Sequence, residues 1–233
     1  MAKNTNNKQT EGKETVEFFK DLDKEALKTE KFLEKNAKII ASLIGAVVLV
    51  ILGYFAYNQF VVLPKNEEAM KGFFAAQKNL SEGKNVEALG GKSAANPGFL
   101  GTYNEYSGTS VGKLSAYNAG MLKFKEGKFQ EAYDLLDKFS SKNGVLMAQK
   151  YGAMADCLVS LNKNDDAMSS LNKAISASDD AYTSYFFTKK AGTLALALNK
   201  KEDAKKYFTS IEEKYVDYDN GMSDAFIEMV KYY

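Results

Sequence analysis

The segment Ile39–Leu63 runs for 25 residues without a charged side chain, between Lys38 and Lys65. As an α-helix it would be roughly 37 Å long, which exceeds the hydrocarbon thickness of a bilayer, about 30 Å. Its first part, Ile39–Phe55, carries eleven Ile, Leu, Val or Phe residues, and these contribute about −3 to −7 kcal/mol to membrane insertion. A core helix of a water-soluble domain rarely runs so far without a charge facing solvent. The run therefore predicts a transmembrane anchor at 39–63.

A cleaved signal peptide is the other use of an apolar segment in this part of a chain. Its apolar region is usually about 7–15 residues long and ends in a small-x-small cleavage site. Here 38 residues precede the run, and Ala56–Phe60 offers no such site. Tyr54 and Tyr57 also lie where an interfacial aromatic belt is expected. We therefore interpret the segment as an anchor.

Lysine residues on the two sides of the run predict its orientation. Five lysines lie within fifteen residues before the run and three follow it, and segments rich in lysine tend to stay in the cytoplasm. This favours a bacterial inner-membrane protein with a cytoplasmic N-terminus and a periplasmic domain after the anchor. A cytoplasmic domain is the alternative. The lysines are Lys24, Lys28, Lys31, Lys35 and Lys38 before the run, and Lys65, Lys71 and Lys78 after it.

The tail before the anchor divides into two parts. Residues 1–14 are rich in Asn, Lys and Thr and carry no large apolar side chain after the first position, which predicts disorder. Residues 15–38 place apolar side chains from Val16 to Leu33 at helical spacing among charges, which predicts an amphipathic juxtamembrane helix. Such a helix is either a solvated connector or a helix that lies on the membrane or binds a partner.

Small residues recur at a fixed interval after the anchor. In three sets, a small residue is followed twelve positions later by alanine, and the alanine four positions later by a large apolar residue. The alanines lie 35 and 37 residues apart, close to the tetratricopeptide period of about 34. The turn-forming pairs Glu126-Gly127, Asn162-Lys163 and Asn199-Lys200 separate the two halves of each set. The three sets are Gly120, Gly127, Phe129, Ala132 and Leu136; Ala155, Asn162, Asn164, Ala167 and Leu171; and Gly192, Asn199, Lys201, Ala204 and Phe208.

This interval predicts stacked helical hairpins. The small residue of the first helix and the alanine of the second would let the two axes approach to about 8–10 Å, and the large residue would fill the groove beside them. The sequence thus predicts an all-α protein, in which an N-terminal transmembrane helix is followed by a tetratricopeptide-type α-solenoid of three to four hairpins and a C-terminal capping helix. We place three repeat units at 113–146, 148–182 and 185–218, within a repeat domain that covers 64–233.

A degenerate fourth unit is expected at about 64–98. Ala76, Gly83 and Ala88 repeat the 7-then-5 spacing of the first set. Pro64 would begin its first helix, because proline suits the first turn of a helix and obstructs continuation from the anchor. Its second half is expected to give way to a loop at 90–98.

The end of the chain has no partner hairpin. Residues 222–233 carry Phe226, Ile227 and Val230 on one side, and a terminal repeat needs a covering element. We expect this segment to be the capping helix, reached through a loop at 216–221.

The amino-acid composition excludes many of the side chains that enzymes use for catalysis. The sequence has no histidine and no arginine, so it lacks imidazole bases, imidazole metal ligands and the bidentate guanidinium. The net charge of +1 gives no electrostatic case for nucleic acid. The single cysteine, Cys157, is expected to be a small buried filler. These absences predict a protein that is not an enzyme, with no cofactor, no small-molecule substrate and no bound nucleic acid.

Acidic pairs are the remaining candidates for chemistry. Asp165-Asp166 and Asp179-Asp180 lie at expected turns, where aspartate caps the following helix, and we do not assign them metal or acid–base roles. The segment Asp217–Gly221 is faintly similar to a calcium-binding loop, but it lacks the following bidentate glutamate at EF-hand spacing. No metal site is expected.

The repeat units, the apolar run and the segment Gly98–Thr109 together resemble a known family. They are similar to single-pass tetratricopeptide proteins of Gram-negative inner membranes, and the closest named relative is the ancillary SecYEG translocon subunit family. The resemblance covers roughly residues 32–233. Asn164 and Lys201 depart from the aromatic residue at Phe129, which makes the later units weaker copies. The resemblance implies a cytoplasmic N-terminus, a periplasmic repeat domain, and contact with Sec translocon components or periplasmic chaperones.

The resemblance also implies where a partner would bind. The first helix of each hairpin would line a concave surface, with residues outside the small-residue crossing facing it. The surface would be apolar with two isolated charges, which suits an extended or helical peptide of little net charge. Phe124, Val159 and Leu196 are equally well explained as core residues. The predicted surface residues are Leu114, Tyr117, Met121, Phe124, Gln149, Gly152, Asp156, Val159, Phe186, Lys189, Thr193 and Leu196.

The leading functional hypothesis is a membrane-anchored scaffold for protein–protein interaction. Through the resemblance, it would assist the Sec translocon and periplasmic chaperones in the export or folding of envelope proteins. The alternative is a structural organiser that tethers cell-wall or outer-membrane complexes. An enzyme is a third hypothesis, motivated only by the acidic pairs.

Overall fold

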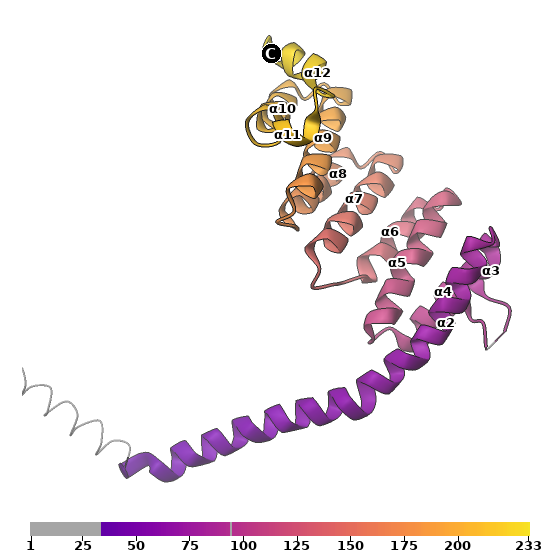
Figure 1. Cartoon of the computed structure of the whole chain (residues 1–233), viewed down its shortest axis with the longest axis vertical. Helices are drawn as coiled ribbons and strands as arrows, with labels where there is room; N and C mark the ends of the chain where they lie inside the picture. Colours follow the sequence, from indigo (N-terminus) through magenta and orange to yellow (C-terminus); the bar gives the residue numbers. More distant parts are fainter. Residues whose placement is uncertain (1–33, 94) are drawn as a thin grey trace, which may run out of the picture. The chain divides into compact units, whose positions relative to one another are not determined.

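The computed structural model describes residues 34–93 and 95–233 and divides into two compact units, Met1–Val61 and Val62–Tyr233 (Figure 1). In the described part of the chain, every assigned element is helical except one isolated bridge between Ser93 and Asn96. The expected disordered tail at 1–14 lies outside the described residues, as does most of the expected juxtamembrane helix at 15–38.

The apolar run is helical. It belongs to a helix, Glu34–Ser81, that is long and apolar enough to cross a membrane. None of its most apolar stretch is buried by the protein: the side chains of Leu49 and Val50 are 70% and 71% exposed. The length and the composition that a membrane span requires are therefore both present, and the same two properties are shared by signal sequences.

Pro64 lies in the first turn of α2 (Leu63–Ser81), as expected, but the chain before it remains helical. A π-helical turn, η1 (Asn58–Val62), directly precedes α2. Proline lacks an N–H and crowds the preceding turn of a regular α-helix, and a π turn has the wider i→i+5 spacing. The expectation that Pro64 interrupts the helix is therefore wrong, because the turn before it widens instead.

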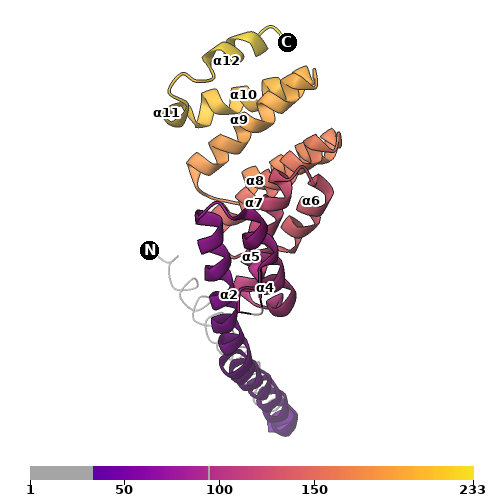
Figure 2. The ribbon, with the colours of Figure 1, turned by 90° about the vertical axis from the view of Figure 1, so that its right-hand side faces the viewer.

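The second unit is a series of packed helical hairpins (Figure 2). The two helices of each hairpin pack on each other, and each second helix packs on the first helix of the next hairpin. This arrangement confirms the predicted all-α, tetratricopeptide-type solenoid with a terminal cap. The elements after α2 are α3 (Asn85–Gly90), α4 (Gly98–Tyr106), α5 (Ser110–Lys125), α6 (Phe129–Lys138), α7 (Gly144–Ser160), α8 (Asn164–Ser176), α9 (Ala181–Ala197), α10 (Lys201–Lys214), α11 (Val216–Asp219) and α12 (Asp224–Val230).

The turn inside each hairpin has one geometry. Gly83, Gly127, Asn162 and Asn199 all have positive φ, between 55° and 75°. In the second hairpin, the N–H of Gly127 donates to the carbonyl of Phe124, and the N–H of Lys128 donates to the carbonyl of Lys123. The other three turns repeat this pair of bonds, which together form a Schellman motif. Glycine and asparagine are the residues that adopt the left-handed conformation at least cost, which explains their recurrence here.

Close crossing of the two helices accounts for the recurring small residues. A Cβ atom on Gly120 would lie 2.9 Å from the side chain of Leu136 and 3.1 Å from the carbonyl oxygen of Ala132. A Cβ atom on Gly192 would lie 2.9 Å from the ring of Phe208. The equivalent alanines Ala132, Ala167 and Ala204 have no exposed surface. The aligned sets thus mark the helix crossings.

The first hairpin of the series is irregular. Its second half is split into the short α3 and α4, and α4 packs on both α2 and α5. The chain between them turns back on itself, because the N–H of Lys92 donates to the carbonyl of Asn96. A Cβ atom on Gly91 would lie 2.2 Å from that same carbonyl oxygen. The expected loop is therefore a tight one that only glycine permits at this position.

The C-terminal cap is α12, which packs on α10. The ring of Phe226 stacks on Phe208 with centroids 5.2 Å apart, and Ile227 and Val230 are buried. The segment 216–221, expected as a loop, instead begins with the helical turn α11. The cap therefore closes the apolar side of the last hairpin, as a terminal repeat requires.

Enlarging the alanine at a crossing should destabilise the hairpins. Ala132→Leu and Ala167→Leu introduce side chains where the helices already touch, so each should cost about 1–3 kcal/mol of unfolding free energy. Urea unfolding of the full-length protein in detergent, followed by circular dichroism, measures the loss. Ala197→Leu on the exposed end of α9 is the matched control and should change little. Equal stability of all three variants would show that the crossings are wrongly placed.

Candidate functional site

The predicted surface residues of α5 contribute to packing as well as to the surface. Tyr117, Met121 and Phe124 are partly buried against a cluster that contains Leu136 and Met154. The ring of Tyr117 lies 5.3 Å from that of Phe139, and the ring of Phe124 lies 5.3 Å from that of Phe129. Both first-helix aromatics are therefore fixed by the hairpin, and they present only part of their surface to solvent.

The surface residues of α7 and α9 divide differently. Gln149, Val159, Phe186 and Thr193 are exposed, whereas Leu196 is half-buried against the largest hydrophobic cluster. Leu114, on α5, is half-buried. The role of these residues in binding stays a prediction.

Gly152 is not on the surface. A Cβ atom there would lie 2.2 Å from the ring of Phe187, a buried residue of the next hairpin. The expectation that Gly152 lines the concave face is wrong, because this glycine makes room for the neighbouring hairpin. The spacing of residues along α7 predicts the helical position of Gly152, but it does not reveal that the large ring of Phe187 packs against it.

The two charges expected to be isolated both have partners. Lys190 forms an ion pair of 2.7 Å with Asp156, which links α9 to α7. Lys189 donates to the hydroxyl of Tyr185 over 3.3 Å and lies 3.5 Å from a carboxylate oxygen of Asp219. These contacts give both charges a role in joining elements.

Two cavities lie where the first helices begin. The α5–α7 pocket, of about 610 Å³, and the α7–α9 pocket, of about 460 Å³, are separated by the first turn of α7, since Leu146 lines one and Val145 lines the other. The α5–α7 pocket is lined by Ser110, Lys113, Leu114, Phe139, Ser140, Ser141, Lys142 and Leu146. The α7–α9 pocket is lined by Val145, Gln149, Asp180, Tyr182, Thr183 and Phe186.

The loop between α6 and α7 is held in place beside the α5–α7 pocket. The buried amine of Lys150 donates to the carbonyl of Phe139 at 2.8 Å and to that of Asp137 at 3.0 Å. Burial lowers the pKa of Lys150, and the adjacent carboxylate of Asp137 opposes this shift. At the start of α7, the Asn143 side chain accepts the N–H of Leu146 as an N-cap. The wall of the α5–α7 pocket is therefore preformed by contacts within the protein.

Sequence reasoning found only part of these pockets. Leu114, Gln149 and Phe186 were predicted, whereas the residues of the first turns and of the α6–α7 loop were missed. The sequence does hold a signal for them, because Val145 and Leu146 lie in the first helical turn after the N-cap Asn143. Both are large apolar side chains in a first turn, and they remain 38% and 42% exposed.

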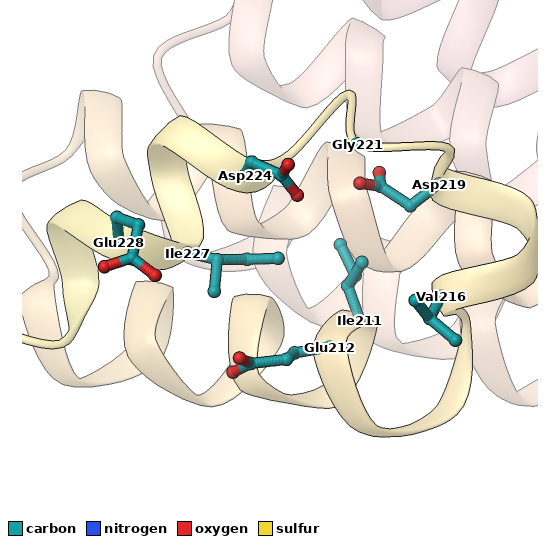
Figure 3. A pocket seen from close by; sticks show the side chains of 8 residues that line it. All are labelled: Ile211, Glu212, Val216, Asp219, Gly221, Asp224, Ile227 and Glu228. Atoms are coloured by element: carbon teal, nitrogen blue, oxygen red, sulfur yellow. The ribbon is translucent and has the colours of Figure 1, made fainter.

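A third cavity, of about 380 Å³, lies between α10 and the cap (Figure 3). Ile211, Ile227 and Val216 form apolar walls, and four carboxylates surround them. Lys231 pairs with Glu212 and Glu228 at 3.5 and 2.6 Å. Among the described residues there is no group of three or more side chains suited to hold a metal ion.

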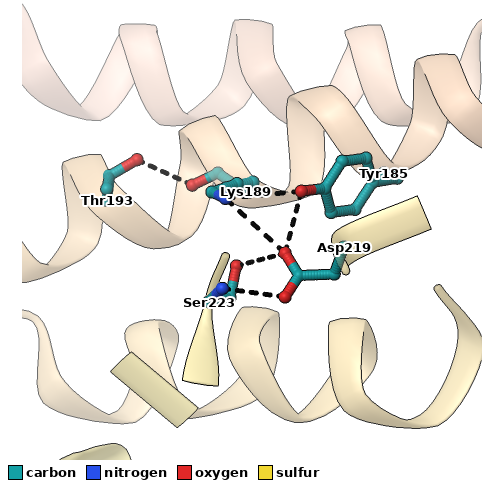
Figure 4. A network of polar contacts seen from close by, with 5 residues as sticks. All are labelled: Tyr185, Lys189, Thr193, Asp219 and Ser223. Carbon is teal, nitrogen blue, oxygen red and sulfur yellow. Dashed lines mark hydrogen bonds and ion pairs between the residues drawn. The ribbon is translucent and has the colours of Figure 1, made fainter. Parts of the chain in front are cut away.

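Asp219 is the centre of a buried polar network that joins α9 to the segment before the cap (Figure 4). Its carboxylate accepts hydrogen bonds from the Tyr185 hydroxyl at 2.8 Å and from the Ser223 N–H and hydroxyl at 2.8 and 2.6 Å. Burial alone would raise the pKa of Asp219, but these bonds and the charge of Lys189 outweigh it and hold the pKa below its ordinary value. Both carboxylate oxygens thus accept hydrogen bonds from the protein itself.

The other candidate groups are also structural. The side chain of Asp180 accepts the N–H of Thr183 at 2.7 Å and so caps α9, as expected. The expectation that Asp165 caps α8 is wrong, because the N-cap is Lys163 and Asp165 lies inside the first turn, where it forms a 2.5 Å ion pair with Lys200 of the next hairpin. Burial raises the pKa of the Cys157 thiol to about 11, so this residue stays protonated near neutrality.

Comparisons with known proteins agree with the fold. No protein-family model matches the chain, and no curated protein matches it. One solved structure, titled "Crystal structure of MamA protein", is similar with a TM-score of 0.51 and 15% identity, over 70% of this chain and 81% of that one. A second, titled "Crystal structure of MamA", has a TM-score of 0.45 and 16% identity, over 66% and 81%. At this identity the first likeness shows a tetratricopeptide-type fold, and it does not extend to the ancillary translocon family.

Removing the charge of Asp219 should loosen the cap. Asp219→Asn keeps the shape but weakens three hydrogen bonds and one ion pair, so we expect a loss of about 1–3 kcal/mol at pH 7. The pKa of Asp219 is lowered by folding, so its contribution is present above the ordinary pKa and is lost as pH falls through the lowered value. The difference from wild type should therefore shrink below about pH 4.

Thermal melts of full-length protein in detergent at neutral and acidic pH test this expectation. Asp217→Asn, in the same helical turn but exposed, is the matched control. A melting temperature at pH 7 that is equal for wild type and Asp219→Asn would contradict the role assigned to the network.

Proposed function

We propose that this protein is a membrane-anchored scaffold that binds protein partners along the first helices of its hairpins. The observation that carries the proposal is the pair of pockets beside α7, with the side chains of Tyr182 and Phe186 still 57% and 46% exposed. Exposed apolar surface around a preformed cavity is typical of an interaction site. Solenoids of stacked hairpins bind partners over such extended surfaces.

The anchor is the second part of the proposal. The apolar side chains of the first unit have no cover from the described part of the protein, and lipid is the solvent that suits them. The excess of lysine before the run supports a cytoplasmic N-terminus and a periplasmic repeat domain at the bacterial inner membrane. The anchor would hold the binding surface beside the membrane.

The proposal assigns no catalytic step. The chain has no histidine and no arginine, and Asp165, Asp180 and Asp219 are engaged in an ion pair, a helix cap and a buried network. Cys157 is fully buried with a raised pKa. The three aspartates therefore have structural partners, and the thiol is held in the core.

The partners that we propose are Sec translocon components and periplasmic chaperones. This choice rests on the resemblance of the repeat units and the anchor to the ancillary translocon subunits. Both pockets have apolar walls that a peptide segment of such a partner could contact.

Site-specific photocrosslinking in intact cells tests the scaffold. A crosslinking residue at Leu146 or Phe186 should form adducts with envelope proteins, whereas one at the exposed Ser169 on α8 should not. Recovery of Sec components or chaperones would support the proposed partners. Recovery of cell-wall or outer-membrane components instead would favour the structural organiser, and adducts at neither pocket position would contradict a binding role.

The topology has a separate test. A reporter that is active only in the periplasm, fused after Tyr233, should be active, because the repeat domain follows a single span. The same reporter fused near Lys3 is the control and should be inactive. Activity restricted to the fusion near Lys3 would invert the proposed orientation.

A further inference from the structure

The α5–α7 pocket carries an unbalanced positive charge. Lys113 lies half-buried on the first turn of α5, and Lys142 lies exposed in the loop before α7. Among the described residues, neither amine has an ion pair or a side-chain hydrogen bond, and no carboxylate lines the pocket. Lys123 and Lys190, further along the first helices, are neutralised by carboxylates at 2.8 and 2.7 Å. The pocket is thus suited to a group that brings its own negative charge.

The α7–α9 pocket has the opposite character. Val145, Tyr182 and Phe186 give it exposed apolar walls. Its single carboxylate, Asp180, already accepts the N–H and the hydroxyl of Thr183 at 2.7 and 2.6 Å. The uncharged amide of Gln149 completes the lining. This pocket is therefore suited to a large apolar side chain.

The two pockets are close enough to take one segment. The consecutive residues Leu146 and Val145 line one pocket each, and α7 contacts both α5 and α9. Packed helices lie about 8–10 Å apart. An extended segment in polyproline II geometry advances about 9 Å in three residues and returns to the same side. Side chains three positions apart can therefore enter the two pockets together.

We propose that the two pockets form one site for an extended protein segment that carries a carboxylate side chain and, about three residues away, a large apolar side chain. The carboxylate lies between Lys113 and Lys142, and the apolar side chain lies among Val145, Tyr182 and Phe186. The proposal rests on the proposed scaffold function and specifies the chemistry of its partner. The serine hydroxyls of the α5–α7 pocket supply donors to the same carboxylate.

A random peptide display library tests the site. The library is panned on the full-length protein in lipid nanodiscs, in four forms: wild type, the double variant Lys113→Gln/Lys142→Gln, the variant Phe186→Ser, and the control Lys173→Gln/Lys206→Gln. The control removes the same charge from exposed positions on α8 and α10. Thermal melts confirm that each form is folded.

Wild type and the control should enrich peptides with an acidic residue about three positions from an aromatic or aliphatic one. The first double variant should lose the acidic preference, and Phe186→Ser should lose the apolar one. For one enriched peptide, replacing its Glu by Gln should weaken binding to wild type about fivefold. The same replacement should change nothing with Lys113→Gln/Lys142→Gln.

Two results would overturn the inference. Enrichment of apolar peptides that depends on Phe186 but shows no acidic preference would remove the charge requirement and leave the scaffold function standing. Enrichment that is the same for wild type and both pocket variants, or none at all, would remove the site and the proposed function together.

Discussion

The repeat unit depends on how closely the two helices of a hairpin approach each other. Gly120 and Gly192 touch the large side chains of Leu136 and Phe208 directly, with no room for a Cβ atom. This contact fixes the crossing, and the Schellman turn at the end of the first helix returns the chain in the same way each time. Because the three later hairpins share this turn and this packing, each presents the start of its first helix at an equivalent place.

The pockets follow from that regularity. At the start of α7, away from the hairpin crossing, Val145 and Leu146 remain partly exposed and each lines one of the two pockets. The loop beside them is fixed by Lys150 and by the Asn143 cap, which gives the α5–α7 pocket a rigid wall. A preformed wall spares a bound peptide part of the ordering cost of the site.

Three polar contacts of the solenoid join neighbouring elements. Lys190 with Asp156 links adjacent first helices, Lys200 with Asp165 links adjacent second helices, and Asp219 joins α9 to the segment before the cap. Such contacts limit how far one hairpin can slide on the next. Lys113 and Lys142, which line the α5–α7 pocket, have no such partner among the described residues.

The sequence by itself determined the features that depend on local spacing. The charge-free run, the small residues at the crossings and the Gly or Asn of each turn could all be predicted, because each reflects the backbone of one helix or one hairpin. Only the tertiary structure decided that Gly152 packs against the ring of Phe187, and that Asp156 pairs with Lys190 and Lys189 with Asp219. It also decided that the pockets lie at the first turns of the first helices. The physical reason is that a repeat period sets how far apart equivalent residues lie along the chain, whereas the side chains of the neighbouring hairpin set what each of them touches.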